Sequence, residues 1–380
     1  MSRPTRALIA SASSAIRSLV AEELAAPAYR AKQISEHLYG KRRARRVRDM
    51  DLIPAELRAR VESAGWEAGR LDVVKGVVSR DGTGKVSLAV GEGEIVEAVG
   101  IPDASCHAET GAAAGPDGVG ALFQSVAGWD KNRLTACVSS QVGCAMRCSF
   151  CATGLQGFKR NLTPAEIASQ VLELEDLYGK RVTDVVFMGM GEPMLNMKSV
   201  VRAIRCMNED IGIGGRHITV STVGIPNSLR LLAQEKLQAT VAISLHAPDQ
   251  ETRMKIVPSA KNYPFEELLD DAKAYFKETG RRVTFEYTLL AGVNDSPSQA
   301  QRLGRMLKRK FGAGAHVNVI PWNKIDGVDH EKPSGNAVHR FCAALEGISH
   351  TIRRTRGDDV SAACGMLTGE FEKRSLRRSD

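Results

Sequence analysis

The spacing of apolar residues divides the chain into a helical N-terminal part, a group of short strands, and a longer region in which strands and helices alternate. Residues 28–40 and 53–65 carry apolar side chains at helical spacing, and each run ends at a glycine, which predicts two short helices. Between residues 71 and 101, three apolar runs are separated by glycine-containing turns. This pattern is typical of hairpin strands and predicts a small β extension.

From residue 135 onward, strands and helices alternate. The predicted strands are residues 135–142, 182–188, 217–222, 240–245, 283–290 and 316–321. The first helix is the clearest, because Thr163 and Glu166 form a capping box with Pro164 at the first helical position. Parallel neighbours need helical crossovers, so the pattern predicts an α/β fold with a parallel sheet. Six such units fit an incomplete (β/α) barrel, and a doubly wound open sheet is the alternative.

Residues 103–130 differ from the regions on both sides. They contain five Gly, seven Ala, four acidic residues and no Lys or Arg. A long segment with such weak periodicity is usually a surface insertion. We therefore predict a flexible insertion outside the barrel.

Positive charge is concentrated near the N-terminus. The chain has 52 Lys and Arg against 44 Asp and Glu, and the first 60 residues hold 13 basic and 6 acidic residues. The densest run is Lys41–Arg46. Such a region favours binding to nucleic acid, and a solvated surface is the alternative. The same two interpretations apply to Arg353, Arg354 and Arg356.

The composition is that of a globular protein, with 43% hydrophobic and 25% charged residues. No apolar run reaches the roughly 18 residues that a membrane span needs. The first 30 residues have scattered charges and no clean apolar core, so we interpret them as part of the mature protein. These features predict a cytoplasmic protein that does not enter a membrane.

Three of the eight cysteines lie close together, at Cys144, Cys148 and Cys151. No nearby histidine completes the set of four ligands that zinc usually takes. Iron–sulfur cubes also normally take four cysteines, so three would leave one iron open to a substrate or cofactor. The spacing C-x3-C-x2-C after the first barrel strand resembles the radical S-adenosylmethionine (SAM) signature. Zinc binding is the alternative interpretation.

Polar residues follow every predicted barrel strand. The carboxyl ends of parallel strands share one rim, where α/β proteins place their chemistry. The residues at this rim include Gly189, Gly191, Glu192, Ser221, Ser244, Leu245, His246 and Asn323. Singly, such residues are more often turns, caps or core histidines, but their shared position predicts one site built from many strands.

Five longer segments resemble the RlmN/Cfr family of radical SAM RNA methyltransferases. They are CVSSQVGCAMRCSFCATGLQGFKRNLTPAEI (137–167), VVFMGMGEPMLN (185–196), AISLHAP (242–248), NVIPWN (318–323) and RRTRGDDVSAACG (353–365). The resemblance extends over nearly the whole chain and is closer to the RlmN branch. It implies a partial (β/α)6 radical SAM barrel at 135–350, with an N-terminal helical accessory domain at 1–70 that binds RNA. The other parts are the β extension at 71–102, the insertion at 103–134 and a C-terminal segment at 351–380.

The resemblance also implies an activity. Family members methylate C2 of adenine, at adenosine 2503 of 23S ribosomal RNA and at adenosine 37 of some transfer RNAs. It implies a [4Fe–4S] cluster, two SAM molecules per turnover, an electron donor such as flavodoxin or ferredoxin, and a monomer. Adenine C2 is not nucleophilic, so a radical has to add to it, and the cofactors supply that chemistry.

Site residues follow from the resemblance by position. Cys144, Cys148 and Cys151 match the cluster ligands, and the cofactor contacts match Gly191, Glu192, Ser221, Ser244, Leu245, His246 and Asn323. Cys364 matches a cysteine that is methylated during the reaction, and Cys137 matches its transient disulfide partner. Glu97 matches the proposed proton acceptor.

The chain departs from the family at residues 103–130, which lengthen a link that is usually short. Cys106 lies inside this segment and matches no family cysteine, so we treat it as incidental. Two other activities stay open. One is C8 methylation of adenine, as in the Cfr branch, and the other is a non-catalytic iron–sulfur or zinc module that binds RNA.

Overall fold

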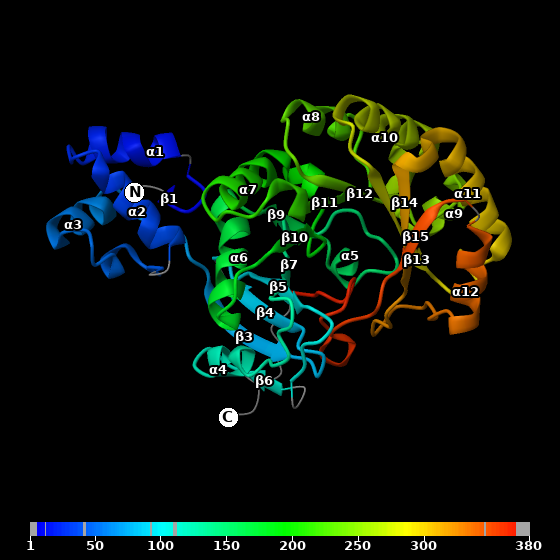
Figure 1. The fold of residues 1–380 in the computed structure, drawn as a ribbon, viewed down its shortest axis with the longest axis horizontal. Helices are drawn as coiled ribbons and strands as arrows, with labels where there is room; N and C mark the ends of the chain where they lie inside the picture. Colours follow the sequence, from blue (N-terminus) through cyan, green and yellow to red (C-terminus); the bar gives the residue numbers. More distant parts are fainter. Residues whose placement is uncertain are drawn as a thin grey trace.

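An eleven-stranded mixed sheet runs through the protein (Figure 1). The computed structural model describes residues 6–11, 13–40, 43–91, 93–108, 112–345 and 347–369. From one edge to the other, the strands are β15 (Ser349–Ile352), β14 (Ala315–Pro321), β13 (Val283–Leu289), β12 (Thr240–Ser244), β11 (Ile218–Thr222), β10 (Asp184–Phe187), β7 (Leu134–Cys137), β5 (Ile95–Pro102), β4 (Gly84–Ala89), β3 (Asp72–Val78) and β6 (Ala112–Ala114).

The seven strands from β7 to β15 are parallel to their neighbours and follow chain order. A doubly wound sheet reverses its strand order at one point, whereas this order continues without reversal. Their crossover helices cover the outer face of the curved sheet (Figure 1), and the main ones are α6 (Pro164–Tyr178), α7 (Met197–Glu209), α8 (Ser228–Gln234), α10 (Phe265–Thr279), α11 (Pro297–Phe311) and α12 (Gly335–Ala344). The predicted partial barrel is therefore confirmed, and β15 adds a seventh parallel strand.

The first barrel strand is shorter than the predicted 135–142. β7 ends at Cys137, and residues 141–143 form a separate strand, β8 (Gln141–Gly143), which pairs with β9 (Phe158–Asn161). The chain leaves the sheet between them because Ser139 Oγ donates to the carbonyl of Glu97 and the Ser140 amide donates to the carbonyl of Met190.

The antiparallel strands β3, β4 and β5 continue the barrel sheet. β5 pairs with β7 in a register that sets Val99 opposite Cys137. The predicted β extension is consequently hydrogen-bonded to the first barrel strand and forms part of the same sheet.

The segment at 103–134 packs on this extension, which differs from the flexible insertion that we expected. Its described residues include β6, which pairs with β3, and α4 (Val119–Gln124). The Phe123 side chain is fully buried, and glycines on the strands make room for it. A Cβ on Gly84 would lie 2.4 Å from the Phe123 ring, and one on Gly76 would lie 2.1 Å from Val119. Val119 and Val126 of the same segment are buried as well.

The N-terminal domain packs beside α6 and α7 (Figure 1). Its elements are β1 (Arg6–Ala7), α1 (Ser13–Ser18), the π-helical turn η1 (Leu19–Glu23), α2 (Tyr29–Tyr39), α3 (Ala55–Ser63) and β2 (Trp66–Glu67). Ion pairs join it to α6, and these are Arg43 with Glu175 and Asp176, Arg45 with Glu173, and Arg70 with Glu173 and Asp176. The Arg70–Glu173 pair is buried on both sides.

These ion pairs change the interpretation of the basic run at Lys41–Arg46. Arg43 and Arg45 point their guanidinium groups at acidic side chains of the same molecule. Lys41 and Arg42 lie outside the described residues, and Arg46 is exposed. At least two of the six positions therefore dock the domain instead of presenting free charge.

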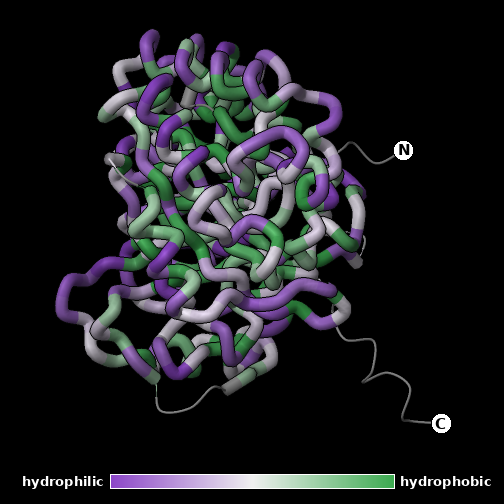
Figure 2. The backbone as a smooth tube through the Cα atoms, turned by 90° about the vertical axis from the view of Figure 1, so that its right-hand side faces the viewer, coloured by the Kyte–Doolittle hydropathy of each residue, from purple (hydrophilic) through white to green (hydrophobic). Residues whose placement is uncertain are grey.

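One continuous apolar core joins the N-terminal domain to the barrel. A second, smaller cluster surrounds the cysteine loop and includes Phe150, Trp322 and Val257. Figure 2 shows the apolar segments running through the interior, with hydrophilic segments on the outer turns. Among the described helices, none is long and apolar enough to cross a membrane.

Candidate active site

The three-cysteine loop, residues 144–151, lies on the concave side of the barrel between β8 and β9. Backbone contacts fix its position from several elements. The Ser149 amide donates to the carbonyl of Ile256 at 2.9 Å, and Trp322 Nε1 donates to the carbonyl of Phe150 at 3.0 Å. The helix α5 (Ala152–Gln156) follows the loop, and the Ala152 amide donates to the carbonyl of Gly365 at 2.7 Å.

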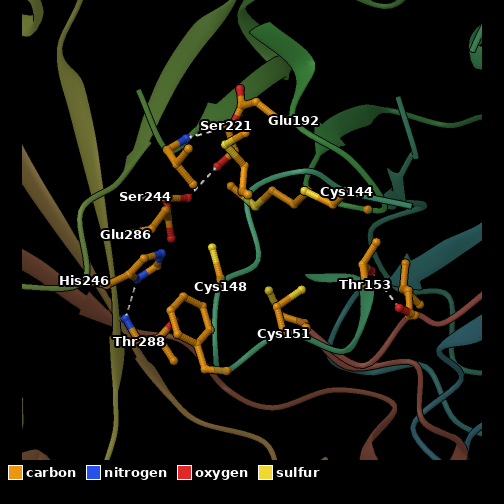
Figure 3. Close-up of a pocket in the computed structure, with 18 of the residues that line it drawn as sticks. Cys144, Cys148, Cys151, Thr153, Glu192, Ser221, Ser244, His246, Glu286 and Thr288 are labelled. Atoms are coloured by element: carbon orange, nitrogen blue, oxygen red, sulfur yellow. Dashed lines mark hydrogen bonds between the residues drawn. The ribbon is translucent and has the colours of Figure 1, made fainter. Parts of the chain in front are cut away.

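Cys144, Cys148 and Cys151 line one cavity (Figure 3). Burial raises the pKa of the Cys144 thiol to about 12 and that of Cys148 well above its ordinary value, and the neighbouring thiols add to both shifts. Buried thiols of this kind become thiolates only next to positive charge, which a metal group supplies. Within the described residues, no three His, Cys, Asp or Glu side chains converge closely enough to hold a single metal ion. The set of three soft sulfur donors on one wall fits an iron–sulfur cluster.

The loop after β10 forms the adjacent wall. Gly191 has a φ of +100°, and a Cβ there would lie 2.5 Å from Gln141, so this close approach needs glycine. Glu192 is buried, and burial raises the pKa of its carboxyl group. Its Oε1 accepts from the Met194 amide at 3.0 Å and its Oε2 from the Val223 amide at 2.9 Å. The carboxylate is thus held at the cavity wall by backbone donors.

Ser221 and Ser244 lie at the carboxyl ends of strands β11 and β12, and their hydroxyl oxygens are 3.3 Å apart (Figure 3). At the rim of β14, Asn323 Nδ2 donates to the carbonyl of Cys364 at 3.3 Å. All three side chains line the cavity together with Cys364. Leu245 is different, because its side chain is buried in the main core.

His246 is the second residue after the end of β12 and has a left-handed backbone conformation with a φ of +58°. Its Nδ1 accepts a hydrogen bond from the Thr288 amide at 3.0 Å, which leaves the proton of the neutral ring on Nε2. The ring of Phe150 packs against the imidazole in an edge-to-face arrangement, with ring centroids 4.7 Å apart. Burial, with a contribution from Arg253, lowers the pKa of His246 to about 3, so the ring is neutral at physiological pH.

Two buried charged residues escaped the sequence analysis. Arg253 in α9 (Gln250–Ile256) is fully buried and donates to the carbonyls of Val223, Ser244 and Leu245. It stands at the strand ends beside the cysteine loop, and burial lowers its pKa to about 10. One arginine in a short polar helix gives no sequence signal of its own. Its position four residues after the cap Asp249, next to the rim histidine, is the only hint.

Glu286 on β13 is the second residue that was missed. It is buried, its Oε1 accepts from Asn318 Nδ2 at 2.8 Å, and burial raises the pKa of the carboxyl group. It lines the cysteine-loop cavity and also a second, neighbouring cavity. Because it is a single acidic residue inside a strand of mostly apolar and β-branched residues, the strand pattern hides it.

The second cavity brings Cys137 and Cys364 together from positions 227 residues apart. Cys364 also lines the first cavity and therefore stands between the two. It keeps solvent-accessible surface, yet the surrounding protein raises the pKa of its thiol to about 12 by burial, as it does for Cys137. Negative charge at Cys364 raises the pKa of the Cys137 thiol further.

Glu97 holds the segment that follows Cys364. Its Oε2 accepts from the amides of Thr368 at 2.8 Å and Gly369 at 3.2 Å, and its Oε1 forms a 2.9 Å ion pair with Lys85. Thr153 Oγ1 fixes the same segment by donating to the carbonyl of Leu367 at 2.6 Å (Figure 3). Glu97 lines neither of the two cavities that contain Cys364. All the other predicted site residues line one or both of these two cavities, and only Glu97 and Leu245 do not.

The chain is similar to known proteins over most of its length. A family model described as the Radical SAM superfamily matches residues 138–301. A protein from Thermosynechococcus vestitus named "probable dual-specificity RNA methyltransferase RlmN" is 46% identical over 343 residues, or 90% of this chain and 92% of that protein. A protein of the same name from Gloeobacter violaceus is 46% identical over 358 residues, covering 92% of this chain and 93% of that protein. The crystal structure of a radical SAM methyltransferase from Sphaerobacter thermophilus matches with a TM-score of 0.83 and 37% identity, over 97% of this chain and all of that chain.

The lowered pKa of His246 predicts a pH dependence of stability. Between the folded pKa of about 3 and the ordinary value near 6.5, the unfolded chain binds a proton that the folded chain does not. Stability should therefore fall as the pH falls below about 6.5. Between pH 7 and pH 5, this one residue should lower the free energy of unfolding by about 2 kcal/mol. Urea unfolding of the metal-free protein at pH 7 and pH 5 measures it, and His246→Gln should show a smaller loss than wild type. Equal losses in the two proteins would contradict a buried neutral histidine.

Proposed function

The chain belongs to the RlmN family of radical SAM RNA methyltransferases, and we propose that it methylates C2 of adenine in RNA. The proposed targets are adenosine 2503 of 23S ribosomal RNA and adenosine 37 of some transfer RNAs. One observation carries this proposal. Cys364 stands between a cavity lined by three clustered cysteines and a cavity lined by a second free cysteine, Cys137. Carrier chemistry on a protein sulfur needs that arrangement of two sites around one thiol.

We propose that Cys144, Cys148 and Cys151 hold a [4Fe–4S] cluster with one open iron. SAM would bind at that iron and contact Gly191, Glu192, Ser221, Ser244, His246 and Asn323. When bound, these groups supply a reactive radical by reductive cleavage of SAM, with the electron coming from a protein such as flavodoxin or ferredoxin. The neutral Nε2–H of His246 and the two serine hydroxyls suit the polar groups of a cofactor. The apolar cluster around Phe150 and Trp322 excludes water from this wall.

Cys364 would act as the methyl carrier. Its thiol accepts a methyl group from one SAM molecule, and a hydrogen atom is later removed from that methyl group, so each turnover uses two SAM molecules. The sulfur-bound carbon radical would then add to adenine C2, which joins the protein covalently to RNA. The adduct would give up one electron, in return for the one used to cleave SAM, as the C2 proton leaves. Cys137 resolves this adduct by attacking the Cys364 sulfur. An S–S bond forms as the S–C bond breaks, and the released carbon keeps the electron pair and takes up a proton to become the product methyl group.

Loss of the C2 proton needs a base, for which Glu97 is our proposal. A general base must reach the proton that it removes. Both Glu97 oxygens are engaged by Lys85 and by the amides of Thr368 and Gly369. The segment after Cys364 would therefore have to move when Glu97 acts. An alternative base is Glu286, which lines both cavities.

The position of methylation is tested by the product. Anaerobically purified protein with a reductant, SAM and a 23S ribosomal RNA fragment should yield 2-methyladenosine after nuclease digestion, identified by mass spectrometry. Cys364→Ala should yield none. A transfer RNA transcript tests the second substrate in the same way. Finding 8-methyladenosine instead would assign the chain to C8 chemistry, and no methylated adenosine would favour the RNA-binding module.

The cluster is tested by iron content. Cys148→Ala should fail to hold the cluster after anaerobic reconstitution, because only two of the three anchoring thiolates would be left. Methylation should be abolished together with the cluster. Cys342→Ala is the matched control, since Cys342 is also a buried cysteine but belongs to α12 in the main core. Roughly four iron and four sulfide per chain are expected in wild type and in the control. Full activity of Cys148→Ala would contradict the radical mechanism.

Cys137→Ala should trap the adduct. The variant lacks the attacking thiol but keeps the carrier, so the protein should accumulate with covalently bound RNA. A denaturing gel would show a nuclease-sensitive band, which should be missing from Cys364→Ala and from the double variant. Cys106→Ala controls for removing a buried cysteine elsewhere in the chain and should carry no RNA. An active Cys137→Ala protein without bound RNA would refute the resolving role.

A further inference from the structure

The second cavity, lined by Cys137 and Cys364, has walls from three distant parts of the chain. One wall is formed by the two ends of the 103–134 segment, at 103–105 and 130–133. The other walls come from Arg216 and His217, before β11, and from residues 353–356, after β15. The two ends of the segment are held together, because the Lys131 amide donates to Asp103 and His107 pairs with Ala127. The segment thus presents a fixed edge to the cavity.

Cations are concentrated at the mouth of this cavity. Lys131, Arg133, Arg216, Arg353 and Arg354 line it and are exposed. Arg133 pairs with Asp184 at 3.3 Å while most of its side chain stays in solvent. The side chains of the other four form no ion pair with another described residue. Asp103, Asp130 and Asp184 also line the cavity, so the five cations outnumber the aspartates around them.

Arg356 is the exception among the cations of the C-terminal wall. It binds Asp81 in the β3–β4 turn at 2.8 Å and contacts the carbonyl of Asp103. It therefore ties the C-terminal wall to the wall formed by the 103–134 segment. Its role is to hold the mouth in shape, and Arg353 and Arg354 are left to face solvent.

Apolar side chains also line the cavity, and they include Val99, Ile101, Val186, Ile320 and Leu367. The buried carboxyl group of Glu286 and the amide of Asn323 add polar groups to the same lining. Exposed cations beside apolar and hydrogen-bonding side chains suit a nucleotide that has left its stack, with its phosphates at the cations and its base against the other side chains. The rival surface, the basic run near the N-terminus, uses Arg43 and Arg45 for internal ion pairs.

We propose that RNA binds at this mouth, with Lys131 and Arg133 of the 103–134 segment and Arg216, Arg353 and Arg354 contacting phosphates on either side of an extruded nucleotide. The proposal rests on the proposed function, since it assumes an RNA substrate whose base must reach Cys364. It gives the 103–134 segment a role as one wall of the RNA-binding surface.

Three charge-reversal variants test this surface. Lys131→Glu with Arg354→Glu alters the mouth. Arg46→Glu with Arg48→Glu alters exposed residues of the N-terminal basic region. Lys277→Glu with Arg309→Glu makes the same charge change on exposed positions of the outer helices α10 and α11. Binding of the full-length variants to a fluorescent 23S ribosomal RNA fragment is measured by anisotropy over a series of salt concentrations.

The mouth variant should bind RNA about tenfold more weakly at low salt. The slope of log K against log salt concentration should be less negative than in wild type by about two. The outer-helix variant should bind like wild type. Equal affinity of the mouth and outer-helix variants, or a larger loss in the N-terminal variant, would overturn the proposal. These outcomes differ from failure of the proposed function, in which wild type itself neither cleaves SAM nor methylates RNA.

Discussion

The antiparallel pairing of β5 with β7 is the interaction on which the site depends. It places Val99 opposite Cys137 and so joins the hairpin extension to the first strand of the barrel. Ser139 continues this contact by donating to the carbonyl of Glu97. Because of this pairing, Glu97 can hold the amides that follow Cys364, and Cys364 is kept between the cysteine loop and Cys137. This pairing gives the extension and the C-terminal segment a common support.

The parallel strands, the first helix and the rim could be predicted from sequence because their signals are local. Thr163 and Glu166 form the capping box that the sequence indicates, with the Glu166 amide donating to Thr163 Oγ1 at 3.2 Å. Residues 103–130 were predicted to be a flexible insertion, and the packing of Phe123 in α4 could not be foreseen, since composition says nothing of where one buried phenylalanine packs. The early end of β7 was missed because hydrogen bonds from Ser139 and Ser140 to distant carbonyls redirect the chain.

A different reason explains why two site residues were missed and two surface charges were misinterpreted. The residues that were missed are Arg253 and Glu286, and the misinterpreted charges are Arg43 and Arg45. Each is defined by a partner or an environment far away in sequence, so neither charge counts nor strand patterns reveal it. Arg43, for example, pairs with residues 132 and 133 positions away. The cysteine pair was found only through resemblance to a family, since 227 intervening residues carry no sign that Cys137 and Cys364 meet.

The position of the C-terminal segment has a consequence for how the protein is made. The hydrogen bonds that hold it, from Thr368 to Glu97 and from Arg356 to Asp81, join residues 271 and 275 positions apart. Contacts over such separations form late, because the whole intervening chain must be ordered first. On a ribosome, the barrel and its cysteine loop emerge before residues 364–369 do. The cysteine loop is therefore open on that side until residues 364–369 have emerged, and only then can the wall that carries Cys364 be added.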